Sequence, residues 1–207
     1  MSGLEVSLLG RFYATLDGRP LDNFRTSKVQ ALLIYLLLHA LEHADQGVGR
    51  EHAMTLLWPE MPRKSAQVNL RQTLYHLRQA IPDVDDNNGE PVPFILSDRQ
   101  TVRVNPAARY ELDAASFVSL VKEGDRERLA AAVELYRGDF LADFYLEDSS
   151  EFETWAAGWR GRLRRQALET LDQLMDGELA RRQLREAAAY ARRRWLSTNC
   201  AKAPTGG

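Results

Sequence analysis

The sequence has very little cysteine and no long apolar run. Cys200 is the only cysteine among 207 residues, which excludes an intramolecular disulfide and fits a reducing cytosol. The longest apolar run, Ala31 to Leu38, is far too short to cross a bilayer. The first residues lack the basic start, apolar run and cleavage site of a signal peptide. We therefore expect a cytoplasmic chain with no membrane partner.

The sequence has no excess of positive charge, since 27 Lys and Arg residues stand against 29 Asp and Glu. The net charge of −2 excludes a uniformly basic nucleic-acid binder, so any DNA-binding surface must be confined to one element. One stretch, between Met61 and Pro82, has no acidic residue at all. Its bases are Arg63, Lys64, Arg71 and Arg78. An acidic, Asn-, Gly- and Pro-rich segment follows at residues 83–93, which predicts an exposed loop.

Signatures of catalysis are missing as well. The sequence has no G-x-S-x-G, no P-loop, no glycine fingerprint and no cluster of metal ligands. His39 and His43 lie one helical turn apart and could share a metal, but no third ligand is evident. Two ordinary helix histidines fit the pattern better. We therefore expect a protein that is not an enzyme and has no cofactor, no metal and no small-molecule ligand.

The acid-free stretch predicts an amphipathic helix from Arg63 to Pro82. Leucines at 70, 74 and 77, with isoleucine at 81, recur at helical spacing and predict a buried stripe. The opposite face is polar and basic, which suits the major groove of DNA, where Arg binds guanine and Asn or Gln binds adenine. The alternative is an ordinary solvated face. The candidate recognition residues are Lys64, Gln67, Val68, Asn69, Arg71, Gln72, Tyr75, His76, Arg78 and Gln79.

The neighbouring segments predict a winged helix-turn-helix domain around this helix. Strands over residues 4–9, 12–16 and 19–21, with an Asp17-Gly18 turn, predict a small antiparallel sheet. Helices over 27–43 and 50–58 precede the 63–82 helix. Strands over 94–97 and 101–104 then predict a hairpin, the wing. Candidate backbone contacts are Arg25, Lys28, Arg99 and Arg103, and a solvated turn residue is the alternative for Arg99.

The second half of the sequence predicts helices alone. The expected ranges are 111–121, 127–137, a long helix that opens with a Ser150-x-x-Glu153 capping box, and 184–195. Trp155 and Trp159 follow helical spacing, a pattern more typical of core packing than of a ligand groove. Leu184, Ala188, Ala191 and Trp195 share one side of the last helix. The fold class is mainly α with small β-sheets (α+β): a winged helix-turn-helix followed by an all-α domain.

In this order, the segments resemble the SARP-type transcriptional activators, in which an OmpR-type winged helix precedes a bacterial transcriptional activator domain (BTAD) with helices like those of tetratricopeptide (TPR) repeats. The matching stretches are LEVSLLGRF, VGREHAMTLLWPE, NLRQTLYHLRQAI, FILSDRQTVRVNP, ELDAASFVSLV and LAAAVELYRGDFLADFYLEDSSEFETWAAGWRGRLRRQALETL. The resemblance implies a winged-helix domain at 1–106, an incomplete helical domain at 107–196 and a disordered tail at 197–207.

The sequence departs from that pattern in two places. Arg182 stands where the family usually has Gly in a tight turn between helices. After Trp195 the helical period stops, whereas the family continues with further helical hairpins, so we expect apolar surface to be exposed near Tyr190 and Trp195.

The resemblance implies a sequence-specific transcriptional regulator that acts as an activator and binds promoter direct repeats as side-by-side copies. Its partners would be double-stranded DNA, a second copy as a homodimer on DNA, and RNA polymerase, with the helical half providing the protein contacts. The alternative is a truncated adaptor that modulates a full-length regulator without binding DNA itself. Replacing Arg71 and Arg78 by Ala discriminates the two, because an adaptor would keep its partner binding.

Overall fold

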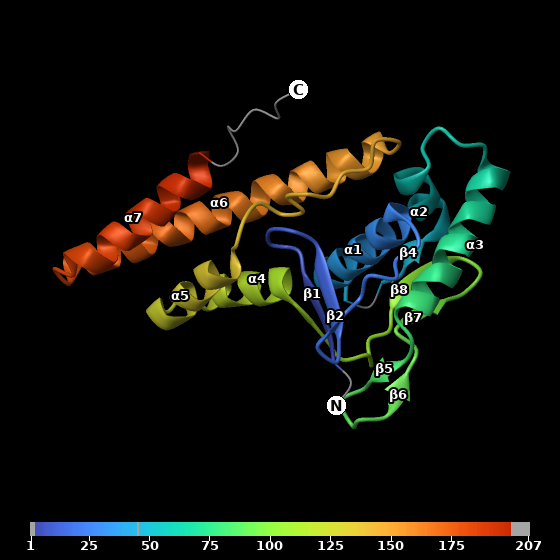
Figure 1. The fold of residues 1–207 in the computed structure, drawn as a ribbon, viewed down its shortest axis with the longest axis horizontal. Helices are drawn as coiled ribbons and strands as arrows, with labels where there is room; N and C mark the ends of the chain where they lie inside the picture. Colours follow the sequence, from blue (N-terminus) through green and yellow to red (C-terminus); the bar gives the residue numbers. More distant parts are fainter. Residues whose placement is uncertain (1–2, 45, 200–207) are drawn as a thin grey trace. The chain divides into compact units, whose positions relative to one another are not determined.

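The computed structural model describes residues 3–44 and 46–199 and has the expected α+β fold, with seven helices and nine strands in that part of the chain (Figure 1). The chain forms two compact units. The first comprises Met1–Ser7, Tyr13–Leu112 and Phe144–Ala156, and the second Leu8–Phe12, Asp113–Asp143 and Ala157–Gly207. Each unit thus includes a short segment from the other half of the sequence, whereas the sequence analysis predicts a single boundary near residue 106. The functional division at that residue stays a prediction.

The first unit opens with a four-stranded sheet of order β3-β2-β1-β9. Strands β1 (Leu4–Ser7), β2 (Tyr13–Leu16) and β3 (Arg19–Pro20) are antiparallel, as predicted. Asp17 and Gly18 both have positive φ in the predicted turn, the conformation that a two-residue hairpin requires. The fourth strand, β9 (Tyr110–Leu112), pairs with β1 in parallel.

Strand β9 corrects one prediction. The sequence analysis placed residues 111 and 112 in a helix, but they continue the sheet, and helix α4 begins at Asp113. The reason is a long-range pairing: Leu112 lies opposite Val6 and is buried with it. The helical period of residues 113–121 gives no information about strand β1, with which residues 110–112 pair.

Three helices pack beside this sheet in the order that the sequence predicts. Helix α1 (Ser27–Glu42) is apolar on most faces, and nine of the ten residues from Val29 to Leu38 are buried. Helix α2 (Arg50–Leu57) follows a short strand, β4 (Val48–Gly49), and ends before Trp58-Pro59, where a proline disfavours helical backbone in the residue before it. Helix α3 covers Arg63–Ala80.

The wing forms as predicted, with an additional strand. Strands β7 (Ile95–Ser97) and β8 (Thr101–Val104) make the hairpin, and β4 pairs with the other edge of β8. Gly47 lies where the chain enters β4, and a Cβ atom there would approach the Cβ of Thr101 to 2.8 Å. The close approach of these backbones therefore requires glycine.

The acidic segment after α3 is more ordered than predicted. Strands β5 (Val84–Asp85) and β6 (Pro91–Val92) form a small hairpin within the expected loop. The carboxylate of Asp86 accepts hydrogen bonds from the backbone N–H groups of Asn88 and Glu90, at 2.7 and 2.9 Å. These bonds close the turn, and they hold the pKa of Asp86 below its ordinary value.

The second unit is helical. Helices α4 (Asp113–Glu123) and α5 (Arg126–Leu135) form a pair. The carboxylate of Asp113 accepts the buried backbone N–H groups of Leu8 and Leu9, at 2.8 and 3.0 Å, which attaches the segment after β1 to the start of α4. Burial raises the pKa of Asp113, against the opposing effect of these hydrogen bonds.

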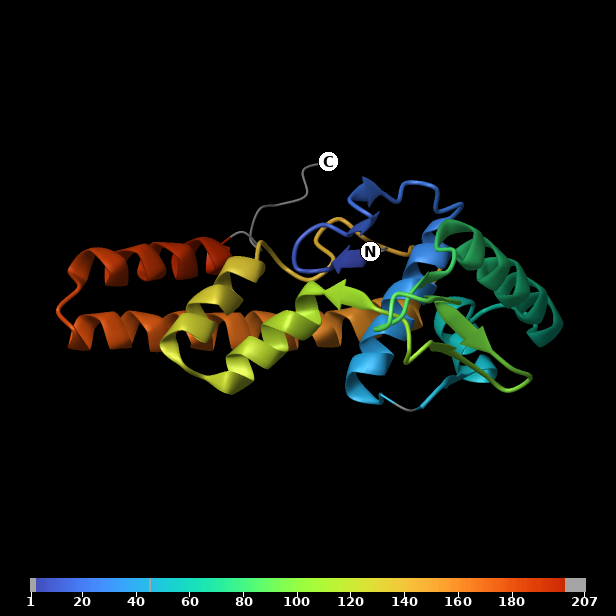
Figure 2. The same ribbon diagram turned by 90° about the horizontal axis from the view of Figure 1, so that it is seen from below.

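Helix α6 (Ser150–Ala180) is continuous, and α7 (Leu184–Asn199) runs antiparallel beside it (Figures 1 and 2). Trp159, Leu163, Leu171 and Leu174 of α6 are buried, which favours core packing over a ligand groove. The predicted capping box does not form with Ser150 as the N-cap, because Ser150 is already the first residue of helix α6. The carboxylate of Glu153 instead accepts the backbone N–H of Leu146 at 2.8 Å.

Helix α7 differs from its prediction in two respects. It extends to Asn199, so the first residues of the expected tail are helical, while residues 200–207 and Cys200 lie outside the described part of the chain. Ala187 is buried and Tyr190 packs on a core of Leu129, Val133, Leu171 and Leu174, whereas Leu184 and Trp195, which the sequence groups on one side, are exposed. The expectation of exposed apolar surface is confirmed at Trp195 and is wrong at Tyr190, which is half-buried.

The turn between α6 and α7 forms despite the arginine. Arg182 has φ +61°, the left-handed conformation that favours glycine. The N–H of Arg182 donates to the carbonyl of Leu179 at 3.0 Å, and the N–H of Gln183 donates to that of Glu178 at 2.9 Å. This is the hydrogen-bond pattern of a Schellman cap.

No helix in the described part of the chain is long and apolar enough to cross a membrane.

Candidate nucleic-acid interface

Helix α3 has the two faces that the sequence predicts. The stripe of Leu70, Leu74, Leu77 and Ile81 is almost fully buried. The opposite face points to solvent, and Tyr75 on that face is 60% exposed. An apolar stripe in the core fixes the rotation of the helix, so the acid-free face is presented as a rigid surface.

The candidate recognition residues fall into two groups. Most of them are exposed: Lys64, Gln67, Val68, Arg71, Gln72, Tyr75, Arg78 and Gln79. Asn69 and His76 are half-buried at the edge of the face. The amide of Asn69 lies 3.1 Å from the sulfur of Met61, and the ring of His76 packs edge-on against Tyr75, with centroids 5.4 Å apart.

Arg78 connects the helix to the wing. Its guanidinium donates to the hydroxyl of Ser97, at the end of β7, at 2.7 Å. This contact fixes the wing strand relative to α3, so Arg78 has a structural role in addition to any contact with DNA.

The wing turn is braced by Asp98. Its carboxylate accepts the N–H groups of Thr101 and Gln100, both at 2.7 Å, and the Thr101 hydroxyl at 2.9 Å. These bonds, the Thr101 backbone contact first among them, lower the pKa of Asp98. Arg99 lies between the bonded residues and is exposed, so a rigid turn presents its side chain to solvent.

Four arginines from three elements surround one hollow of about 330 Å³ in the first unit. Arg50 is the first residue of α2, Arg63 and Arg71 lie on α3, and Arg99 is in the wing turn. The other lining residues are Glu51, Met54, Gln67 and Leu70. A single carboxylate therefore faces four guanidinium groups, which gives the hollow an excess of positive charge.

The arginines are held in place by the surrounding backbone and by Glu51. Arg63 forms an ion pair with Glu51. The Nε of Arg50 donates to the carbonyl of Asp98, and the Nε of Arg71 donates to that of Gln67, both at 3.4 Å. Each of these bonds leaves guanidinium N–H groups available, because an arginine has five donors.

Sequence reasoning missed Arg50 and Arg63 as site residues. Arg63 was noted only as one of the bases of the helix, and Arg50 was not noted at all. Its backbone N–H donates to the carbonyl of Gln100 at 2.8 Å, so the start of α2 is attached to the wing turn. This contact joins residues fifty positions apart, and no local pattern in the sequence indicates it.

Lys28 lies in a different environment from the one expected. Its side chain is only 12% exposed, and its ammonium donates to the carbonyl of Leu57 at 2.5 Å and pairs with Asp148 at 2.8 Å. It also lies over the ring of Trp58. These partners occupy Lys28, so we leave it out of the interface. Arg25, before α1, and Arg103, on β8, are exposed.

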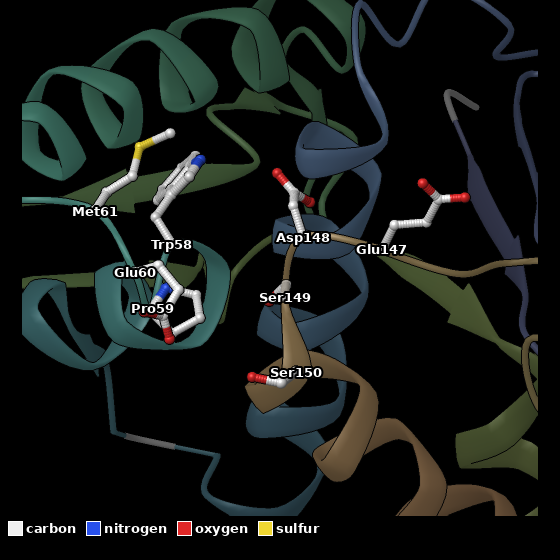
Figure 3. A pocket seen from close by; sticks show the side chains of 8 residues that line it. All are labelled: Trp58, Pro59, Glu60, Met61, Glu147, Asp148, Ser149 and Ser150. Carbon is white, nitrogen blue, oxygen red and sulfur yellow. The ribbon is translucent and has the colours of Figure 1, made fainter.

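A second hollow of about 270 Å³ in the same unit has the opposite charge. Figure 3 shows its lining: Trp58, Pro59, Glu60 and Met61 come from the connection between α2 and α3, and Glu147, Asp148, Ser149 and Ser150 lead into α6. The buried hydroxyl of Ser149 donates to the carbonyl of Leu56 at 2.5 Å. The carboxylates make this hollow unsuitable for a phosphate.

Three of the histidines lie close to Tyr35 or to one another. The rings of His39 and His43 are 4.9 Å apart, and the hydroxyl of Tyr35 is 2.8 Å from Nε2 of His52. Across residues 3–44 and 46–199, no group of three or more His, Cys, Asp or Glu side chains is placed to hold a metal ion. Burial, followed by the charges of His43 and His52, lowers the pKa of His39.

Comparison with known proteins gives a fold but no family. No protein-family model matches the sequence, and no curated protein sequence matches it. A solved structure of Mycobacterium tuberculosis EmbR, in complex with a low affinity phosphopeptide, is similar, with a TM-score of 0.62 and 20% sequence identity. The match covers 87% of this chain and 49% of that one, so the chain spans about half the length of EmbR. The likeness supports a SARP-like fold.

Proposed function

We propose that this protein is a SARP-type transcriptional regulator that binds specific DNA sequences through its winged helix. The observation that carries the proposal is the convergence of four arginines from α2, α3 and the wing turn beside an acid-free helix face. In a chain of net charge −2, such a local concentration of guanidinium groups matches the phosphate backbone better than any other common ligand.

In this proposal α3 enters the major groove. Gln72 and Tyr75, exposed at the centre of the face, would meet base edges, and Arg71 would meet bases or the adjacent phosphates. Arg50, Arg63 and Arg99 would hold backbone phosphates and fix the register of the helix. Arg25 and Arg103 are further candidates for phosphate contacts.

The proposed activity is activation of transcription from promoter direct repeats, with copies bound side by side and RNA polymerase as the protein partner. We propose a cytoplasmic location and no enzymatic activity. These finer points rest on the resemblance to SARP-type activators and on the fold that the chain shares with EmbR. The adaptor alternative has no support from the α3 face, since an adaptor needs no acid-free basic surface.

The test is a binding titration of the full chain against random genomic fragments over a salt series, with sequencing of the bound DNA. We expect one repeated motif to be enriched and affinity to fall steeply as salt rises. Arg50→Ala and Arg99→Ala should each reduce the slope of log affinity against log salt by about one. Arg19→Ala is the matched control, because Arg19 is an exposed arginine on β3 outside the hollow.

Substitutions on the helix face test base reading separately. Gln72→Ala should relax the preference at one position of the motif, with a loss of about 1–3 kcal/mol in discrimination and little change in salt slope. If no motif is enriched, or if Arg19→Ala weakens binding as much as Arg50→Ala does, the proposed interface is wrong.

A further inference from the structure

The four-arginine hollow is lined by Arg50, Arg63, Arg71 and Arg99 and by one acidic residue, Glu51. Its volume of about 330 Å³ lies within the range of small-molecule pockets. Four arginines and one glutamate leave a formal charge of +3. Guanidinium groups gathered in a concave site repel one another and attract anions from solution, because the low-dielectric walls focus their field. The hollow is therefore suited to bind an anion before any DNA is present.

Three of the four arginines form no ion pair. In the part of the chain that the structure describes, the hollow has a single ion pair, between Arg63 and Glu51. Arg50 and Arg71 each donate one N–H group to a backbone carbonyl, at 3.4 Å, and Arg99 is exposed to solvent. An arginine has five N–H donors, so most donors of these three side chains are available to a ligand.

The backbones that carry these three arginines are fixed. The N–H of Arg50, at the start of α2, donates to the carbonyl of Gln100 at 2.8 Å. Arg71 lies within α3, whose apolar stripe is buried. Arg99 lies in the wing turn, where the carboxylate of Asp98 accepts two backbone N–H groups at 2.7 Å. Ordering on binding is thus confined to side chains, which keeps its entropic cost low.

We propose that this hollow binds an oligophosphate, a chain of two or three linked phosphate groups, and that such an anion competes with DNA for the arginines. A single phosphate carries about 1.5–2 negative charges, whereas a triphosphate carries about four, enough to neutralise the formal +3 of the hollow. Guanidinium groups bind phosphate oxygens through paired, planar hydrogen bonds. Linked phosphates can meet arginines of α2, α3 and the wing turn at once. The competition rests on the proposed function, since it requires DNA to use the same arginines, but the anion site does not.

Glu51 provides a test of this site that depends on a gain of affinity. Its carboxylate pairs with Arg63 inside the hollow and repels an incoming phosphate. Glu51→Gln removes the charge and keeps the size of the side chain and an oxygen that can still accept from Arg63. The variant should therefore bind an oligophosphate more tightly, and loss of folding does not produce such a gain.

The experiment is isothermal titration calorimetry of the full chain with inorganic tripolyphosphate, ATP and sulfate at equal ionic strength, in buffer without divalent cations. We expect tripolyphosphate to bind about tenfold more tightly than sulfate, or better. Arg50→Ala/Arg99→Ala should weaken it about tenfold or more, and Glu51→Gln should tighten it about threefold or more. Binding of ATP as tight as that of tripolyphosphate identifies nucleoside polyphosphates as ligands, and weaker binding of ATP identifies inorganic polyphosphates.

Matched controls replace charges of the same sign outside the hollow. Arg19→Ala/Arg185→Ala removes two exposed arginines, and Glu60→Gln removes one exposed carboxylate. Both variants should bind tripolyphosphate as the wild type does. The proposal is overturned if sulfate binds as tightly as tripolyphosphate, if Arg50→Ala/Arg99→Ala weakens binding no more than its control does, or if Glu51→Gln gains no more than Glu60→Gln.

Displacement of a labelled DNA duplex separates this proposal from the proposed function. Tripolyphosphate should displace the duplex with an inhibition constant equal to its calorimetric Kd. If a DNA motif is enriched but tripolyphosphate neither binds nor displaces it, the oligophosphate site is wrong and the DNA-binding function stands. If tripolyphosphate binds with the expected variant effects and the chain binds no DNA, the oligophosphate site stands, and the DNA-binding function and the competition are wrong.

Discussion

Replacing Arg182 by glycine should stabilise the protein. Arg182 holds φ +61° in the Schellman cap at the end of α6. For a residue with a Cβ atom, the left-handed conformation costs about 1–2 kcal/mol. Glycine relieves that strain, but the greater conformational freedom of glycine in the unfolded chain lowers the free energy of unfolding by about 0.4–1 kcal/mol. The midpoints leave a net stabilisation of about 0.8 kcal/mol, equivalent to a rise in Tm of about 2–3 °C.

The assay is urea and thermal unfolding followed by far-UV circular dichroism. Arg182→Ala separates conformation from charge, because alanine keeps the strain while it removes the guanidinium. We expect this variant to lie within about 0.5 kcal/mol of the wild type. Arg185→Gly, three residues further on within α7, is the matched control for glycine itself and should lose about 0.5–1 kcal/mol. If Arg182→Gly is no more stable than Arg182→Ala, the reasoning from backbone strain is refuted.

Three further predictions test the packing and electrostatics of the two units. Asp113→Ala leaves two buried backbone N–H groups without acceptors, so urea unfolding should show a loss of about 2–5 kcal/mol, and an unchanged midpoint would contradict this. Gly47→Ala should cost about 1–3 kcal/mol, because its Cβ would lie 2.8 Å from that of Thr101, whereas Gly49→Ala, whose Cβ meets nothing within 4 Å, should be tolerated far better. Because the pKa of His39 is lower in the folded protein than in the unfolded chain, the unfolded chain binds a proton at this histidine first as pH falls. The contribution of neutral His39 to stability is therefore fully present above pH 6.5 and is lost as pH falls through the folded-state pKa. His39→Gln should flatten that part of the pH profile, and an equally steep profile would exclude His39 as its source.

The sequence was sufficient to predict a helix and its buried face where the apolar residues form one clear stripe. The leucine stripe of α3 contrasts with an outer face that has no acid and little apolar surface, so only one rotation of the helix buries the leucines. The hairpin turn at Asp17-Gly18 was equally predictable, since its residue types match the positive φ values of such a turn.

The parts that failed depend on partners distant in the chain. Strand β9 is a strand because β1, more than a hundred residues earlier, offers an edge to pair with. The hollow of four arginines requires the start of α2 to meet the wing turn through the N–H of Arg50 and the carbonyl of Gln100. Periodicity describes one segment at a time, so it cannot report a contact of this kind.

Helix α7 shows a different limit of the same reasoning. Its alanines, leucines, tyrosine and tryptophan are spread over more than half of its circumference, so helical spacing allows more than one side to be buried. The sequence analysis grouped Leu184 and Trp195 on one side of the helix without assigning either side to the core. In the structure Tyr190 packs on Leu129, Val133, Leu171 and Leu174 of the second unit, and Arg193 and Arg194 pair with Glu134 on α5 and Asp172 on α6. The rotation of α7 therefore follows contacts with α5 and α6 that no period within α7 itself can report.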